Sequence, residues 1–320
     1  MRTVLLAHPD AQQAAASLTS LALASGGQDN ASAVVLRVTG LPPENLRDSL
    51  EGIARLPLPP RFKPGQDFDG LLIDEVLHDS RATLLYRVTD QLSGQQLVLK
   101  TLRPELADDA DEIRALIMEE WRARRIVSPF FAQLVPADRR SCLYYLQTWH
   151  EGATLQRMLD ADIHFTVADA VQHGIRLMKG LSTLHRLDVA HRDIKPANIH
   201  IGRDGRLRIL DLGVALSLSE DEATAGSPGT PSYMAPELFA GDKAGPAHDL
   251  YAAGVTLYHL LTRKYPYGEI EPFQHPRFGE PVPPTRYRPD IPGWLENVLL
   301  KAVARDPAQR FETAVQILMA

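Results

Sequence analysis

Four polar residues in the middle of the chain have types and spacings that suit the transfer of a phosphoryl group. The stretch HRDIKPANI contains Asp193, Lys195 and Asn198, and the stretch LDLG, shortly after it, contains Asp211. Asp193 can accept a proton from a hydroxyl, and Lys195 adds a positive charge two residues later. The oxygens of Asn198 and Asp211 are hard donors of the kind that Mg2+ prefers. Because phosphoryl transfer needs mainly positioning and charge neutralisation, these residues could supply its chemistry.

The order and spacing of these motifs resemble the catalytic loop and metal-binding motif of the eukaryotic-like protein kinases. The resemblance implies that Asp193 is the catalytic base, with Lys195 beside it, and that Asn198 and Asp211 hold Mg2+ or Mn2+ with ATP. It covers roughly residues 66–320. It implies an α+β fold, the bilobal protein kinase fold, with a small β-rich N-lobe carrying one main helix and a larger, mainly helical C-lobe.

The elements that must position these residues are visible in the hydrophobic pattern. Short aliphatic and β-branched runs at 68–77, 83–90 and 95–102 are separated by turn residues and predict an antiparallel meander. A helix is predicted at 109–127, and LYYLQTW at 143–149 again has strand character. These elements form the predicted N-lobe.

The chain beyond about residue 152 is predicted to be mainly helical. Apolar residues recur at helical spacing in 170–187, 247–262 and 293–304. We therefore place the N-lobe at residues 66–148 and the C-lobe at residues 149–320.

A lysine and a glutamate of the predicted N-lobe are expected to form an ion pair. The resemblance places Lys100, at the end of LVLK, where the family has its phosphate-binding lysine, and Glu119 follows in the predicted helix. Glu120 is the competing partner. Glu119 shares its helix face with apolar residues such as Leu116, whereas Glu120 shares its face with Arg124. Because the apolar face points inward, Glu119 is the predicted partner, and both members of the pair are counted with the catalytic residues.

The resemblance also assigns the residues around ATP. LQTWHEG is similar to the hinge between the lobes, and its backbone from Thr148 to His150 would meet the adenine edge. Val98 replaces the small residue that faces adenine, so its methyl groups would crowd the ring. The implied nucleotide-binding residues are Leu77, Ser80, Leu85, Val98, Lys100, Thr148, Trp149, His150 and Asn198.

The loop that should cover the phosphates contains no glycine. The family's GxGxxG pattern aligns with His78, Ser80 and Thr83. Glycine permits positive φ and lets backbone N–H groups reach phosphate oxygens, and holding one or two other residues in strained backbone costs on the order of 1–3 kcal/mol. We expect replacement donors from Ser80, His78 or Arg81, and we expect Asp79 to repel the phosphates.

The stretch GTPSYMAPE resembles the end of an activation segment. Lys195 together with Thr230 resembles the serine/threonine-specific pattern of the family, and Thr230 would hydrogen-bond toward Asp193 and Lys195.

Arg192, directly before the catalytic aspartate, marks kinases whose activation segment is ordered by phosphorylation, because a phosphate can pair with its guanidinium. Thr224 is the first candidate for that phosphate and Ser227 the second; an unmodified loop is the alternative.

Three further residues have structural roles by resemblance. Glu237 would pair with Arg310, and Asp249 would hydrogen-bond the backbone of the catalytic loop. They would hold the C-lobe together and take no part in the chemistry.

The N-terminal residues resemble a different family. Residues 22–38 are similar to the C-terminal end of the metal-dependent protein phosphatases of the Mg/Mn type, with Asp29 as the matching metal ligand. One aspartate cannot build a two-metal site. Residues 1–40 are therefore interpreted as a remnant of such a domain, as in phosphatase–kinase fusions, or alternatively as an unrelated extension.

The same pattern predicts a helix at 12–25 and a strand at 32–38 before a proline-rich linker at 41–65.

Composition excludes several classes of partner. A net charge of -6 and a pI near 6.0 argue against nucleic-acid binding, so RARR at 122–125 is interpreted as a solvated helix face. The single cysteine, Cys142, has apolar neighbours and is predicted to be buried. The sequence has no apolar run long enough for a membrane span, and its first residues do not resemble a signal peptide, so we expect no membrane partner and a cytoplasmic location.

The sequence therefore predicts a serine/threonine protein kinase that uses ATP on protein substrates, including itself, and that is slow because its phosphate loop lacks glycine. The alternative is a pseudokinase, a regulatory nucleotide-binding module that controls an attached or separate phosphatase domain.

Overall fold

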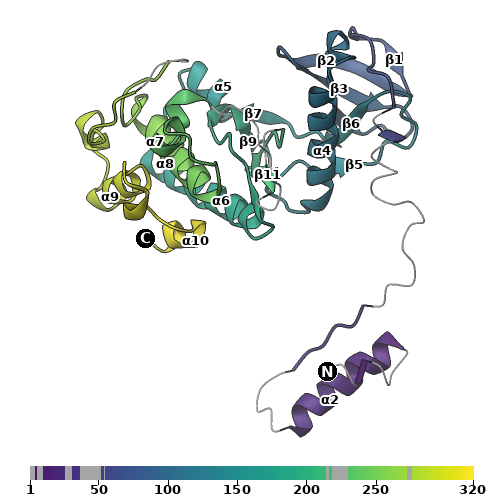
Figure 1. Cartoon of the computed structure of the whole chain (residues 1–320), viewed down its shortest axis with the longest axis horizontal. Coiled ribbons are helices and arrows are strands. Elements are labelled where there is room, and N and C mark those ends of the chain that lie inside the picture. The colour runs from purple at the N-terminus through teal and green to yellow at the C-terminus, as the bar shows by residue number, and fades with distance from the viewer. Residues whose placement is uncertain are drawn as a thin grey trace. The chain divides into compact units, whose positions relative to one another are not determined.

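The computed structural model describes residues 4–5, 10–25, 31–36, 52–53, 55–213, 216–217, 230–271 and 276–320. The chain divides into two compact units, Met1–Gly52 and Ile53–Ala320 (Figure 1).

The first unit contains the helix α2, Ala11–Ala24, which confirms the predicted helix. Asp10 caps it, because its carboxylate accepts a hydrogen bond from the Gln13 N–H. The predicted strand at 32–38 is wrong over the residues that the structure describes, because 31–36 form no strand. A strand needs a neighbour to pair its backbone groups, and Val34 and Leu36 are instead almost fully exposed. Asp29 lies outside the described residues.

The N-lobe is built on a six-stranded antiparallel sheet in the order β1-β2-β3-β4-β6-β5. The predicted meander is confirmed as β2, β3 and β4, and the alternating burial of β3 places Leu84, Tyr86 and Val88 in the core. The strands are β1 Asp67–Phe68, β2 Leu71–Asp79, β3 Thr83–Asp90, β4 Gln96–Leu102, β5 Leu134–Val135 and β6 Tyr144–Thr148.

The main helix of the N-lobe is α4, Ala110–Arg125, which packs against β4 and follows the short 3-10 helix η1, Pro104–Leu106. The interpretation of RARR as a solvated face is wrong for Arg122, which is buried. Arg122 lies three residues after Glu119 and shares its inward face. Cys142 is buried, as predicted.

The segment Pro57–Lys63, here called the strap, packs on this sheet, although the sequence suggests that it belongs to the linker. The Leu143 N–H donates a 2.8 Å hydrogen bond to the Pro57 carbonyl. Phe62 is buried against Phe68 and Tyr86, with ring centroids 4.6 and 5.4 Å away. Phe62 of the strap is therefore part of the N-lobe core.

The C-lobe is mainly helical, as predicted, and its core forms where the long helices α6 and α8 pack together. Its helices are α5 Leu155–Asp160, α6 Val167–His185, η2 Pro196–Asn198, η3 Pro231–Tyr233, α7 Pro236–Phe239, α8 Pro246–Thr262, η4 Pro284–Arg286, α9 Gly293–Ala302, η5 Pro307–Gln309 and α10 Ala314–Met319. Its strands are β7 Gly152–Thr154, β8 Val189–Ala190, β9 Ile199–Gly202, β10 Leu207–Ile209 and β11 Leu216–Ser217, paired in the orders β10-β9-β7 and β11-β8.

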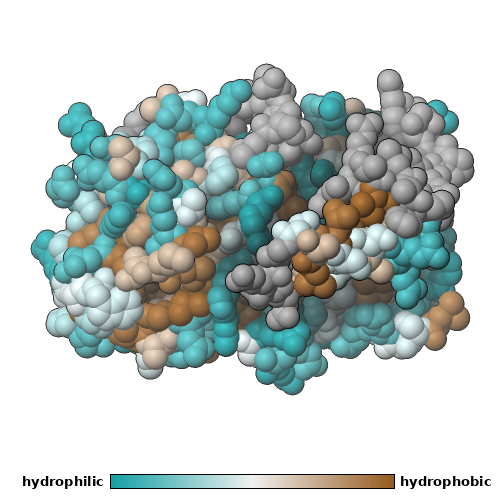
Figure 2. Space-filling view, turned by 90° about the horizontal axis from the view of Figure 1, so that it is seen from below, coloured by the Kyte–Doolittle hydropathy of each residue, from teal (hydrophilic) through white to brown (hydrophobic). Residues whose placement is uncertain are grey.

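Hydrophilic side chains cover much of the face seen in the space-filling view and separate the hydrophobic patches on it (Figure 2). Among the described helices, none combines the length and the apolar character that a membrane crossing requires.

Candidate active site

A cleft of about 540 Å3 brings together residues from both lobes. Its walls come from β2, β3 and β4 of the N-lobe, from the segment between β6 and β7, and from the C-lobe residues around η2 and β9. All the nucleotide-binding residues predicted from the sequence line it: Leu77, Ser80, Leu85, Val98, Lys100, Thr148, Trp149, His150 and Asn198.

A cluster of three charged side chains lies inside this cleft, and two of them are buried. The Lys100 ammonium is 2.7 Å from a Glu119 carboxylate oxygen and 2.8 Å from an Asp211 carboxylate oxygen. Lys100 and Glu119 are 5% and 3% exposed, so both charges are removed from water. Glu120, the competing candidate, instead contacts Arg140 at 2.8 Å. The choice of Glu119 from its helix face therefore agrees with the geometry.

The protonation of the cluster follows from this geometry. Burial alone would lower the pKa of Lys100, but the two adjacent carboxylates outweigh it and raise that pKa. Burial would raise the pKa of Asp211, yet the Lys100 charge and its hydrogen bond leave it below the ordinary value. Burial dominates at Glu119 and raises its pKa. At neutral pH the cluster holds a protonated lysine beside an ionised Asp211.

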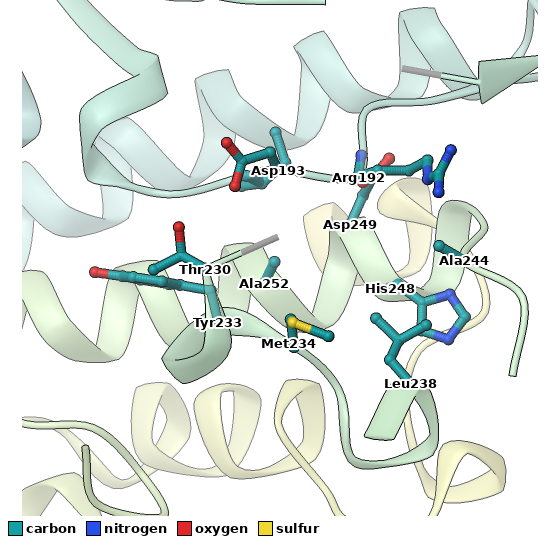
Figure 3. A pocket seen from close by; sticks show the side chains of 11 residues that line it. Arg192, Asp193, Thr230, Tyr233, Met234, Leu238, Ala244, His248, Asp249 and Ala252 are labelled. Atoms are coloured by element: carbon teal, nitrogen blue, oxygen red, sulfur yellow. The ribbon is translucent and has the colours of Figure 1, made fainter. Parts of the chain in front are cut away.

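The catalytic-loop residues converge on Asp193. Its carboxylate accepts hydrogen bonds from the Lys195 ammonium at 2.7 Å and from the Asn198 amide at 2.9 Å. Lys195 also donates to the Thr230 hydroxyl at 2.9 Å, and this hydroxyl points toward Asp193 (Figure 3). Asp193 is therefore held in one orientation, with Thr230 connected to it through Lys195.

Asp249 of α8 binds the backbone of this catalytic loop by hydrogen bonds. Its two carboxylate oxygens accept 2.8 Å hydrogen bonds from the His191 and Arg192 N–H groups, and it is 1% exposed. Arg192 has a φ of 70°, which is unfavourable for a residue other than glycine. Asp211 has a φ of 61°. Such strain gathers at functional sites and persists where surrounding bonds enforce it.

Glu237 and Arg310 form a second anchor in the C-lobe. The Arg310 guanidinium donates to both Glu237 carboxylate oxygens, at 2.6 and 2.8 Å. Burial would raise the pKa of Glu237, but the hydrogen bonds from His248 and Arg310 lower it to about 2. This pair connects the end of the activation segment to the end of the C-lobe.

Comparison with known proteins decides the family. The sequence profile of the protein kinase domain matches residues 81–318. The chain belongs to the protein kinase family. It is 30% identical over 243 residues to a probable serine/threonine-protein kinase of Streptomyces coelicolor, covering 72% of this chain and 36% of that protein. It is 30% identical over 237 residues to the serine/threonine-protein kinase PrkC of Bacillus subtilis, again covering 72% of this chain and 36% of the relative. The chain thus spans little more than a third of these relatives' lengths.

Solved structures agree on the fold. The crystal structure of the Mycobacterium tuberculosis PknI kinase domain matches with a TM-score of 0.60 and 26% identity, covering 80% of this chain and 97% of that one. The bilobal protein kinase fold is therefore confirmed. The relatives named above are serine/threonine-protein kinases, and members of the protein kinase family use ATP with Mg2+ or Mn2+.

The kinase cleft has a donor set that fits a nucleotide-bound metal. Asn198 donates its amide N–H groups to Asp193, which leaves its side-chain oxygen as a ligand, and Asp211 supplies a carboxylate in the same cleft. Mg2+ is usually held by one or two protein oxygens together with phosphate oxygens and water. Among the described residues, no cluster of three or more His, Cys, Asp or Glu side chains forms a metal cage, so the phosphates would complete the coordination.

The phosphate-covering turn between β2 and β3 corrects one expectation. None of the described residues 77–83 has a positive φ, so the expected backbone strain is absent. The turn is instead closed by Ser80, whose hydroxyl oxygen accepts hydrogen bonds from the Ala82 and Thr83 N–H groups at 3.3 and 2.9 Å. Ser80 thus makes the turn possible without glycine, and it uses two of the amides that could otherwise reach a phosphate.

Asp79 has a different position from the one expected. It lies outside the residues that line the cleft. Its carboxylate pairs with Arg61 at 3.1 Å and with Arg103 at 2.5 Å, and these contacts lower its pKa. Its negative charge is therefore offset outside the cleft.

The hinge is held by Thr148. Its N–H donates to the Gln133 carbonyl at 2.9 Å, and its hydroxyl accepts from the Gln133 N–H at 3.0 Å. Its hydroxyl also lies 3.0 Å from the His150 imidazole. These bonds fix the start of the segment that would meet the adenine.

Sequence reasoning missed His200 on the floor of the cleft. It lies on β9 between Thr154 of β7 and Arg208 of β10, in direct register with both, and it is 8% exposed. Burial, aided by the charge of Arg208, lowers its pKa to about 4. No strand period links His200 to Asn198, because Asn198 ends η2 and β9 begins only at Ile199.

The predicted phosphorylation sites Thr224 and Ser227 lie outside the described residues.

Proposed function

We propose that this chain transfers the γ-phosphoryl group of ATP to serine or threonine hydroxyls of protein substrates. The observation that carries the proposal is the convergence of two clusters in one cleft. Asp193, held by Lys195 and Asn198, lies in the same cleft as the Lys100 and Asp211 pair.

The proposed steps assign each residue one task. The substrate hydroxyl oxygen forms a bond to the γ-phosphorus while the bond to the bridging oxygen of ADP breaks, and the hydroxyl proton passes to Asp193. Lys195 offsets negative charge beside the attacking oxygen, and Lys100 binds phosphate oxygens. A bound Mg2+ held by Asn198 and Asp211 would neutralise the phosphates.

The serine/threonine preference is supported by the contact between Lys195 and Thr230. This contact joins the end of the activation segment to the catalytic loop. The Thr230 hydroxyl then lies beside Asp193, where the short side chain of a substrate serine or threonine would enter.

We further propose that the reaction is slow. Ser80 binds the amides of Ala82 and Thr83, so these donors are lost to the nucleotide unless the turn opens. Hydrogen bonds from backbone amides to phosphate oxygens strengthen nucleotide binding, so the absence of these two bonds weakens the binding of ATP.

Autophosphorylation of the activation segment is the proposed means of activation, at Thr224 first and Ser227 second. The supporting observations are their places shortly before Thr230 and the presence of Arg192 next to the catalytic base. Mass-spectrometric mapping after incubation with MgATP tests this, and phosphate on neither residue would contradict it.

For the N-terminal unit, we propose that residues 1–40 are the remnant of a metal-dependent phosphatase domain and that the protein acts in the cytoplasm. We propose that residues 41–65 connect this remnant to the kinase, with the strap Pro57–Lys63 as the part that packs on the N-lobe. The resemblance of residues 22–38 supports the first point. A phosphatase assay with Mn2+ should detect no activity from this chain, since one aspartate cannot hold two metals.

The experiment that tests the proposed function compares the purified chain with Asp193→Asn, using Mg2+, terminally labelled ATP and a generic basic protein. Label above the variant's level on serine and threonine, identified by phosphoamino acid analysis, is expected. The alternative, a regulatory nucleotide-binding module, is favoured by the glycine-free turn. It would bind MgATP and leave both proteins equally unlabelled.

A further inference from the structure

The strap, Pro57–Lys63, precedes the matched kinase residues 81–318 and is attached to the N-lobe at several points. At its beginning, the Pro57 carbonyl accepts a hydrogen bond from the Leu143 N–H at 2.8 Å. Near its end, Phe62 is 7% exposed, and its N–H donates to the Tyr86 hydroxyl at 3.3 Å. These contacts fix the residue between them, Arg61, over the sheet.

Arg61 extends from the strap to the phosphate-covering turn. Its guanidinium donates to one Asp79 carboxylate oxygen at 3.1 Å, while Arg103 donates to the other oxygen at 3.1 and 2.5 Å. The Arg103 N–H also donates to the carbonyl of Ala82 at 2.8 Å. The turn is therefore held at its base from two sides, by the strap and by the residue after β4.

We propose that Arg61 is a positioning residue for nucleotide binding, which acts through Asp79 to hold the phosphate-covering turn over the cleft. The inference rests on the proposed function to the extent that the cleft binds ATP. Arg61 does not line the cleft itself, whereas Ser80, the neighbour of Asp79, does.

The physical reason is preorganisation. A turn that must be ordered on binding costs conformational free energy, whereas a turn that is already held costs less. Arg61, Asp79 and Arg103 are all partly exposed, with side chains 44%, 35% and 29% accessible, so a single pair contributes little to global stability. Its effect should therefore appear in the order of the turn and in nucleotide affinity rather than in the melting temperature.

The test compares Arg61→Ala with Arg61→Lys and with Lys63→Ala, a matched loss of charge at an exposed position of the same strap. Without nucleotide, amide hydrogen exchange over residues 77–85 should be faster in Arg61→Ala. Its KM for ATP should rise on the order of two- to fivefold, with kcat within about twofold of the wild type. Arg61→Lys should recover much of both effects, and Lys63→Ala should match the wild type.

A double mutant assigns the effect to Asp79. In an Asp79→Asn background, the Arg61→Ala change should add nothing further to exchange or KM. Unchanged exchange in Arg61→Ala, equal effects in Lys63→Ala, or full additivity with Asp79→Asn would each overturn the proposal. A wild type that transfers no phosphate would count against the proposed function, and the exchange comparison would still decide the role of Arg61.

Discussion

Different physical interactions hold the two sides of the cleft, which are the floor around Asp193 and the roof formed by the turn around Ser80. On the floor, Asp193 is held by charged and amide donors, and its backbone neighbours are bound by Asp249 inside the protein. On the roof, the turn around Ser80 is closed by its own side chain and tied through Asp79 to surface arginines. The catalytic loop is anchored by the buried Asp249, whereas the turn that covers the phosphates is held by exposed side chains.

This difference indicates that nucleotide affinity can be weakened in this cleft without loss of the catalytic groups. The catalytic groups depend on burial and charge pairing, so a single change affects both rate and stability. The turn depends on local side-chain bonds, so changes there alter nucleotide affinity and leave the fold intact. The absence of glycine is therefore expected to weaken activity without abolishing it.

Among changes on the two sides of the cleft, Lys100→Met is expected to cause the largest loss of activity. It leaves the buried Glu119 carboxylate and the Asp211 carboxylate without their cation, and we expect phosphoryl transfer to fall by about 100- to 1000-fold. Steady-state kinetics with labelled ATP measure it. Lys179→Met, at an exposed position of α6, is the control and should be unaffected. Retained activity in Lys100→Met would show that the cluster is not the phosphate-binding site.

Asp249→Ala should affect folding as well as activity. Two buried backbone amides, those of His191 and Arg192, lose their acceptor, which should lower the free energy of unfolding by roughly 2–4 kcal/mol. Denaturant unfolding measures this loss. Because Arg192 needs those bonds to keep its positive φ, activity at a temperature where the variant remains folded should also fall. A stable and active variant would contradict the assigned role.

Glu237→Gln tests the anchor by its pH dependence. The folded pKa of Glu237, about 2, lies below the ordinary value of 4.5, so its contribution is present above about pH 4.5 and is lost as the pH falls toward 2. The wild type should melt at a higher temperature than Glu237→Gln at pH 7, and this gap should narrow between pH 4.5 and 2. A gap that does not change with pH would exclude the titration of Glu237 as its source.

The smallest effect is expected on the roof of the cleft. Ser80→Gly frees the Ala82 and Thr83 amides for the phosphates and permits positive φ, so nucleotide affinity should rise by about two- to tenfold. Calorimetric titration with MgADP measures it, and Ser93→Gly in the next hairpin is the control. Weaker binding in Ser80→Gly would mean that Ser80 itself contacts the nucleotide.

Sequence reasoning succeeded where a motif or a local period determines the geometry. The helix face of Glu119 indicated its contact with Lys100, and the family resemblance predicted the ion pair between Glu237 and Arg310. It failed where a contact depends on residues far apart in the sequence or on side-chain capping. The contact of Arg61 with Asp79 and the closure of the turn by Ser80 have no periodic signal, so the sequence predicts a linker at the strap and strained backbone at the turn.

The most direct test of the account measures nucleotide binding and phosphoryl transfer side by side in the wild type and in Asp193→Asn. Because Asp193 acts on the attacking hydroxyl, both proteins should bind MgATP with similar affinity, while only the wild type labels serine and threonine residues. If both proteins bind MgATP equally and neither transfers phosphate, the floor of the cleft is not catalytic and the chain is a nucleotide-binding module.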